Sequence, residues 1–101
     1  SNYYQSKFEH NKNIEIVKES IYCKSNYWLN AIKINFKSIK ERNNFLNKMI
    51  KKHECRPLWT LLHKLPMYCN CPRDKMSNAI NLEKKIITLP SGAKYGKELL
   101  R

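Results

Sequence analysis

The chain has 101 residues, the length of one ordinary domain, and 42% of them are hydrophobic, enough for a single modest core. No apolar run approaches the roughly 20 residues of a membrane span, and no secretion signal opens the chain, so we expect a cytoplasmic protein with reduced cysteines. The net charge of +12 suggests nucleic acid, yet only four of the twenty basic residues are Arg, which base-reading and bidentate phosphate sites favour. We therefore expect neither nucleic acid nor a membrane among its partners.

The N-terminal third is expected to form a short helix and two strands. Tyr4 and Phe8 stand four apart and would share one side of a helix over residues 3–10. Ile14, Ile16 and Ile21 fall among polar residues in a pattern that favours a strand. The segment 27–36 mixes aromatic and β-branched residues, which is typical of a second strand that pairs with the first.

The clearest predicted element is a helix from Ile39 to His53. Ser38, followed three residues later by Glu41, is a capping box, in which the Ser hydroxyl and the Glu carboxylate satisfy free backbone N–H groups. One side of this helix is expected to pack on the sheet, and its opposite face, rich in Lys and Asn, is expected to face water. The packing side comprises Ile39, Asn43, Leu46, Met49, Ile50 and His53.

The C-terminal half begins with an irregular stretch over residues 55–72, in which Leu58 to Leu62 are expected to form a helical turn that Pro66 ends. Ser77 is expected to cap a second helix from Asn78 to Lys85. Residues 86–89 then form a short strand, and 90–92 a turn. This order predicts a small α/β (α+β) sandwich, with helices on one face of a three- or four-stranded sheet.

One stretch of the chain suggests a binding site. Between Cys55 and Tyr68, aromatic, His and Arg residues are concentrated in a loop that two prolines constrain. Ordering such side chains in a loop has an entropic cost that burial there does little to offset, so the stretch suggests a functional role, with simple packing as the alternative.

This stretch belongs to an ordered set of motifs that covers roughly residues 3–92. The motifs are Lys24-Ser25-Asn26-Tyr27-Trp28-Leu29-Asn30-Ala31, then Arg56-Pro57-Leu58-Trp59 with Leu62-His63-x-Leu65-Pro66-Met67-Tyr68, Cys71-Pro72, Ser77-x-Ala79-x-x-Leu82-Glu83 and Ile87-x-Leu89-Pro90-Ser91-Gly92. Together they resemble the C-terminal signature of a known family, the DegT/DnrJ/EryC1/StrS aminotransferases. Within the family the chain is most similar to the branch that acts on nucleotide-linked 4-keto-6-deoxy amino sugars, in routes to legionaminic-acid-like and lipopolysaccharide sugars.

The resemblance implies that residues 1–101 form a single domain, the small C-terminal domain of a type I aminotransferase fold. The missing large N-terminal domain would hold pyridoxal phosphate on a lysine, and the full-length enzyme would be a homodimer that moves an amino group from glutamate to a nucleotide-linked ketosugar. No sequence here matches that around the cofactor lysine. We therefore expect this chain to be inactive alone and to bind no cofactor.

The resemblance also implies where substrate would bind. His63 and Tyr68 would line the nucleotide-sugar side of the cleft, with Arg56 and Asn26 nearby, since imidazole and phenol groups can orient sugar hydroxyls and Arg can meet a diphosphate. The residues expected in the core instead are Trp59, Leu62 and Leu65. The tail, residues 93–101, departs from the family ending and is interpreted as divergent or truncated.

A second hypothesis is a stand-alone basic binding module for nucleic acid or an acidic partner. In one form of it, Cys55, His63, Cys69 and Cys71 would supply four zinc ligands. The single residue between Cys69 and Cys71 is shorter than the gap of a common zinc knuckle, which counts against the metal.

Overall fold

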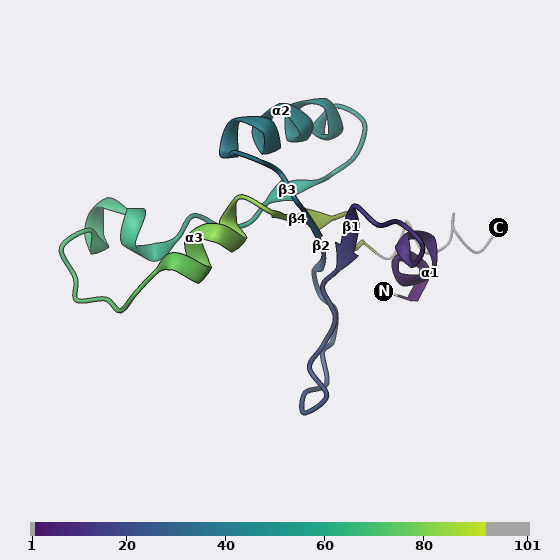
Figure 1. Cartoon of the computed structure of the whole chain (residues 1–101), viewed down its shortest axis with the longest axis horizontal. Helices are drawn as coiled ribbons and strands as arrows, with labels where there is room; N and C mark the ends of the chain where they lie inside the picture. Colours follow the sequence, from purple (N-terminus) through teal and green to yellow (C-terminus); the bar gives the residue numbers. More distant parts are fainter. Residues whose placement is uncertain (1, 93–101) are drawn as a thin grey trace.

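The computed structural model describes residues 2–92, and the tail at 93–101 lies outside the described residues. It forms a small α+β fold with a four-stranded antiparallel sheet in the order β1-β2-β4-β3, which confirms the predicted fold class (Figure 1). In this view α2 lies above the sheet, while α1 and α3 lie to opposite sides of it. The elements are α1 Asn2–Phe8, β1 Ile14–Ile16, β2 Asn30–Ile34, α2 Ile39–Ile50, β3 Arg56–Pro57, the 3-10 turns η1 Leu62–Lys64 and η2 Pro66–Tyr68, α3 Ser77–Glu83 and β4 Ile86–Leu89.

The strand register divides the sheet into two faces of different chemistry. Ile16 lies opposite Ile32, which lies opposite Ile87, and Ile87 lies opposite Pro57, so these four share one face. The alternate positions form the other face: Glu15 with Lys33 and Ile86, and Ala31 with Thr88 and Arg56. The first face, which is apolar, is called the core face below, and the second the open face.

The hydrophobic core lies between the core face and α2. Ile87 is fully buried, and Ile32, Phe36, Leu46 and Cys55 are nearly so. The Phe36 ring packs on Phe45 of α2 with ring centroids 5.5 Å apart. Removing these side chains from water is the main source of the fold's stability.

Helix α2 begins at the predicted residue and ends three residues earlier than predicted. The Ser38 hydroxyl accepts a hydrogen bond from the Glu41 backbone N–H at 3.2 Å, as expected of the cap, while the Glu41 carboxylate accepts one from the N–H of Lys37 at 2.7 Å. The buried side is rotated from the predicted one, because Arg42 is buried while Ile39 and Ile50 are exposed.

Helix α1 is tied to the end of β4. The Tyr4 hydroxyl donates a 2.6 Å hydrogen bond to the Pro90 carbonyl oxygen, and the Tyr4 and Phe8 rings stack, as their spacing suggests. The turn at 90–92 is joined to the start of β2, because the Ser91 hydroxyl accepts a hydrogen bond from the Asn30 N–H at 3.0 Å.

Several expectations about local structure were wrong. Ile21 and Trp28 lie outside the strands, in the connection 17–29, which Figure 1 shows projecting from the sheet between β1 and β2. Ser77 does not cap α3, since Met76 occupies the cap position and no side chain bonds there. Pro66 begins a 3-10 turn instead of ending a helix, which its fixed φ angle and missing N–H permit at a first position.

Strand β3 was not predicted. It contains Arg56 and Pro57, and among residues 2–92 its pairing partner is β4, which makes it an edge strand of the described sheet. Proline is tolerated there because it need not donate to a further strand. Within residues 2–92, no helix has the length and apolar character needed to cross a membrane.

Candidate functional site

The open face carries a groove of about 580 Å³ at the β3 edge of the sheet. It brings together a segment before β2, the strand β3 with the residues that follow it, and one residue of β4. Arg56 is the charged member of the lining set. The lining residues are Trp28, Leu29, Arg56, Pro57, Leu58, Trp59, Thr60 and Thr88.

Arg56 is held in place by the short β3–β4 pairing. It lies opposite Thr88, whose hydroxyl donates to the Arg56 carbonyl oxygen at 3.2 Å. The exposed guanidinium donates to the Cys55 carbonyl oxygen at 3.4 Å, which leaves most of its N–H groups available. Cys55 itself points into the core, and burial raises the pKa of its thiol despite the nearby Arg56 charge, so this thiol is unsuited to act as a nucleophile.

Trp28 reaches the groove from a tightly turned loop. The Asn26 side-chain oxygen accepts a hydrogen bond from the Trp28 N–H at 3.0 Å, and the Ser25 hydroxyl accepts one from the Tyr27 N–H at 3.0 Å. Tyr27 has a φ angle of 48°, a left-handed conformation that is unfavourable for a residue other than glycine. This local network presents the Trp28 indole to solvent, and 70% of the residue is exposed.

Trp59 follows β3 and is 74% exposed, so the expectation that it belongs to the core was wrong. Leu62, at 67%, was also expected in the core and is exposed, whereas Leu65 is half-buried. Side chains from α2, the strands and the residues next to them fill the core, so the side chains of the loop after β3 are left outside it. Sequence alone indicated an unusual loop here but not the direction of its side chains.

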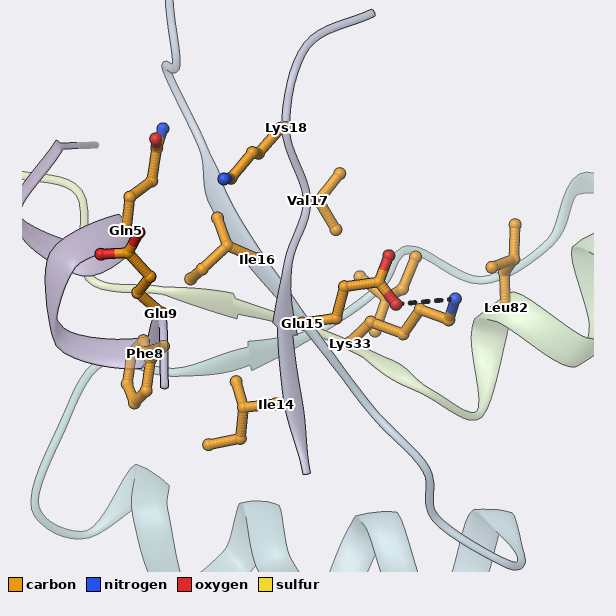
Figure 2. Close-up of a pocket in the computed structure, with 11 residues that line it drawn as sticks. Gln5, Phe8, Glu9, Ile14, Glu15, Ile16, Val17, Lys18, Lys33 and Leu82 are labelled. Carbon is orange, nitrogen blue, oxygen red and sulfur yellow. Dashed lines mark hydrogen bonds and ion pairs between the residues drawn. The ribbon is translucent and has the colours of Figure 1, made fainter. Parts of the chain in front are cut away.

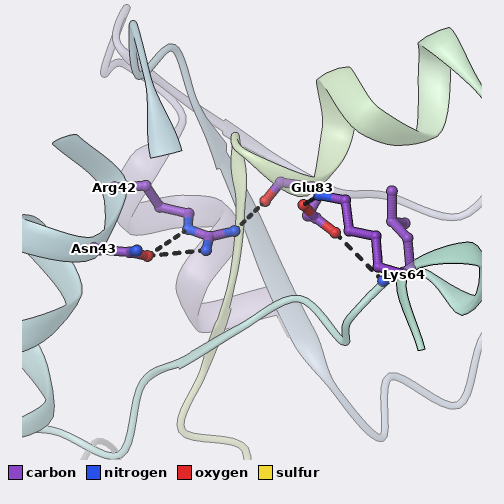
Figure 3. Close-up of polar contacts among 5 residues, drawn as sticks. Arg42, Asn43, Lys64 and Glu83 are labelled. Carbon is purple, nitrogen blue, oxygen red and sulfur yellow. Dashed lines mark hydrogen bonds and ion pairs between the residues drawn. The ribbon is translucent and has the colours of Figure 1, made fainter. Parts of the chain in front are cut away.

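The loop that carries Trp59 is anchored at Glu83, a residue that the sequence analysis did not select (Figure 3). The Glu83 carboxylate accepts hydrogen bonds from the Leu61 N–H at 3.3 Å and from the Lys64 ammonium at 2.6 Å. Arg42 of α2 donates to the Glu83 carbonyl oxygen and also to the Asn43 side-chain oxygen, which joins α2 to the end of α3. One buried residue therefore connects three segments.

The charge of Glu83 is well compensated. Burial alone would raise the pKa of its carboxyl, but the hydrogen bonds from Lys64 and from the Leu61 N–H, with the positive charges of Lys64 and Arg42, hold that pKa below its usual value. Glu83 is therefore a structural anchor that stays ionised at neutral pH, not a proton donor.

The structure does not bring all four predicted substrate residues to one place. Arg56 lines the groove, and Asn26 supports Trp28 through its side chain. His63 in η1 and Tyr68 in η2 are not among the lining residues. The His63 Nδ1 atom is buried without a hydrogen-bond partner in the described part of the chain, and Tyr68 is 46% exposed.

The four candidate zinc ligands are not assembled into a site. Cys55 lies in the core, and the Cys69 thiol donates to the Pro66 carbonyl oxygen at 3.2 Å. Among residues 2–92 there is no group of three or more His, Cys, Asp and Glu side chains placed to hold a metal ion.

A second cavity, of about 650 Å³, lies beside β1 and α1 (Figure 2). Figure 2 shows Glu15 and Lys33 paired with each other there, with a nitrogen–oxygen distance of 3.2 Å. Its other lining residues include the apolar Phe8, Ile14 and Ile16. Because its central charges already neutralise one another, this cavity is less suited than the groove to an ionic ligand.

Comparisons of the sequence with protein-family models and with curated proteins find no match.

Proposed function

We propose that this chain is the small C-terminal domain of a pyridoxal-phosphate-dependent aminotransferase that acts on a nucleotide-linked 4-keto-6-deoxy sugar, in the synthesis of surface polysaccharide in the cytoplasm. The observation that carries the proposal is the groove on the open face. Two motifs that are far apart in the sequence and that resemble the family, Ser25-Asn26-Tyr27-Trp28 and Arg56-Pro57-Leu58-Trp59, contribute its main side chains.

The chemistry of the groove suits one wall of a substrate cleft. An exposed guanidinium can meet a diphosphate, and exposed indole rings can cover the apolar faces of a sugar or base. The residues that line the groove include no lysine, so they do not suit pyridoxal phosphate. The cofactor and the chemistry of amino-group transfer belong, in this proposal, to the large domain.

The exposed apolar residues fit a domain that has a covering partner. Trp28, Trp59, Leu62 and Met67 are each at least 67% exposed. The two tryptophans line the groove, and the other two residues lie in the 3-10 turns η1 and η2, which follow it in the chain. Such surface is costly in an isolated protein and typical of an interface. The proposed partners are the large domain of the same polypeptide and a second copy of the full-length enzyme.

The test of the proposal uses the proposed full-length protein, expressed from a gene that includes the coding sequence upstream of this chain. We expect glutamate-dependent amination of a nucleotide-linked ketosugar, and we expect the Arg56→Gln variant to lower kcat/KM by about tenfold or more, because a charged hydrogen bond to substrate contributes roughly 1.5–3 kcal/mol. Arg73→Gln, a change at an exposed arginine outside the groove, is the matched control.

Two results would contradict the proposal. The first is an upstream reading frame without a cofactor-binding lysine domain. The second is an absorbance band of bound cofactor when the 101-residue chain alone is mixed with pyridoxal phosphate. The basic-module hypothesis predicts instead tight oligonucleotide binding that weakens steeply with salt.

A further inference from the structure

We infer that the groove is a stacking site for the nucleotide part of the substrate, in which Trp28 and Trp59 hold the base and Arg56 holds its phosphate, without reading which base is present. The inference deepens the proposed function and rests on it in taking a nucleotide-linked sugar as the natural ligand. Its evidence is the composition of the groove itself.

The aromatic part of the argument concerns where the tryptophans lie. The chain has two tryptophans, and both line this one groove with 70% and 74% of their surfaces exposed. Indole faces stack favourably on planar rings, and each such contact typically contributes a substantial share of the free energy with which a nucleobase binds. Two large aromatic residues exposed at one groove therefore favour a ligand with a flat ring.

The electrostatic part concerns what else the groove contains. Arg56 is the single charged residue in the lining set, and no carboxylate in that set neutralises it. Its guanidinium donates to the Cys55 carbonyl oxygen at 3.4 Å, a long contact that an anion would replace. A flat ring joined to a phosphate would both stack on the tryptophans and pair with the Arg56 guanidinium. The groove volume of about 580 Å³ lies within the usual range for small-molecule sites.

The lack of base selection follows from the same lining set. Reading a base edge needs directed donors and acceptors such as Asn, Gln, Asp or Glu side chains. The polar neutral side chains of the groove are two threonines, and the Thr88 hydroxyl already donates to the Arg56 carbonyl oxygen. Stacking tolerates every base because every base has an aromatic face.

The second cavity gives a useful contrast. It has a comparable volume, but its aromatic residue is the half-buried Phe8, and its two glutamates offset the charge of its two lysines. This cavity therefore offers a nucleotide neither an exposed aromatic ring nor a net positive charge, and it suits such a ligand less well than the groove.

The experiment uses tryptophan fluorescence of the 101-residue chain, since both emitting residues belong to the groove. We expect UDP to quench the emission with saturation, and ADP to bind with a dissociation constant within a factor of about five of that for UDP. Uridine, which lacks phosphate, and ribose 5-phosphate, which lacks a base, should each bind at least about tenfold more weakly than UDP.

Variants locate the ligand. In Trp28→Phe only Trp59 emits, and in Trp59→Phe only Trp28 emits, and UDP should quench the remaining tryptophan in both. Arg56→Gln should weaken UDP binding by about tenfold, while Arg73→Gln should leave it unchanged. Circular dichroism of each variant is the check that the fold is retained.

Four results would overturn the inference. They are a dissociation constant for UDP weaker than about 10 mM, equal binding of ribose 5-phosphate, quenching of only one tryptophan, and a preference for single-stranded oligonucleotide over UDP of more than about 100-fold. None of these measurements depends on transamination. If the full-length enzyme is active but its small domain does not bind UDP, the inference is refuted and the proposed function is not. If UDP binds but the full-length protein is inactive, the proposed function is refuted and the inference is not.

Discussion

The two faces of one sheet differ in almost every physical property. On the core face, Ile32 and Ile87 are buried against α2, in a cluster of aliphatic, aromatic and sulfur-containing side chains. On the open face, the same strands present Glu15, Lys33, Thr88 and Arg56, with the groove at one edge and a second cavity at the other. Within residues 2–92, α2 covers the core face, and no helix packs on the open face in the same way.

This difference separates stability from binding. Apolar contact and the Glu83 anchor stabilise the fold from the α2 side, so side chains on the open face can change at little cost in folding free energy. Substitutions that affect one face should therefore leave the function of the other largely intact, and the following predictions test that separation from the largest expected effect to the smallest.

The largest effect is expected for Ile87→Ala on the core face. Ile87 is completely buried, and deleting such a side chain typically costs about 3–4 kcal/mol of unfolding free energy, because its contacts are lost and a cavity remains. Urea denaturation followed by circular dichroism measures this loss.

The matched control for Ile87→Ala is Ile86→Ala, one residue earlier on the same strand but on the open face. Its side chain is half-buried, so the expected loss is about 1 kcal/mol. Equal losses for the two variants would show that both sheet faces are covered in solution, and the separation of the faces would fail.

An intermediate effect is expected for Glu83→Gln, which keeps the shape of the side chain and removes its charge. We expect a loss of about 2 kcal/mol at pH 7, since hydrogen bonds to a buried charged group are stronger than neutral ones. Glu15→Gln, which breaks the exposed Glu15–Lys33 pair, should cost less than about 0.5 kcal/mol.

The pH dependence of stability gives a second readout for Glu83. Its pKa is lower in the folded protein than in the unfolded chain, so its stabilisation is fully present above the ordinary Glu pKa of about 4.3 and is lost as the pH falls from there through the folded value. Thermal unfolding between pH 7 and 3 should therefore show a smaller acid-induced decrease in Glu83→Gln than in the wild type. An unchanged decrease would contradict the role of the anchor.

The smallest effect is expected at the helix caps. Ser38→Ala removes the hydroxyl that accepts from the Glu41 N–H and should destabilise the fold by about 1 kcal/mol. Ser77→Ala is the matched control, because Ser77 lies inside α3 and no side-chain bond caps that helix, so its effect should be within about 0.5 kcal/mol. Thermal denaturation compares the stability of the two variants. A larger loss of stability in Ser77→Ala than in Ser38→Ala would contradict the assignment of Ser38 as the capping residue.

Local patterns in the sequence were sufficient where neighbouring residues decide the structure. The start of α2 follows from Ser38 and Glu41, strands β1 and β4 follow from their branched residues, and the stacked Tyr4–Phe8 pair follows from helical spacing. The helix cap and the stacked pair link residues within a few positions of one another, and the two strands were indicated by their residue types, although their pairing partners lie far away in the sequence.

The tertiary structure decided the features that link distant segments. It placed Trp28 beside Arg56, made an edge strand of Arg56 and Pro57, buried Glu83 under Arg42 and Lys64, and left Trp59 exposed. Each depends on which residues fill the limited space between the sheet and α2. That competition for burial involves the whole chain, and no local pattern of residue types records its outcome.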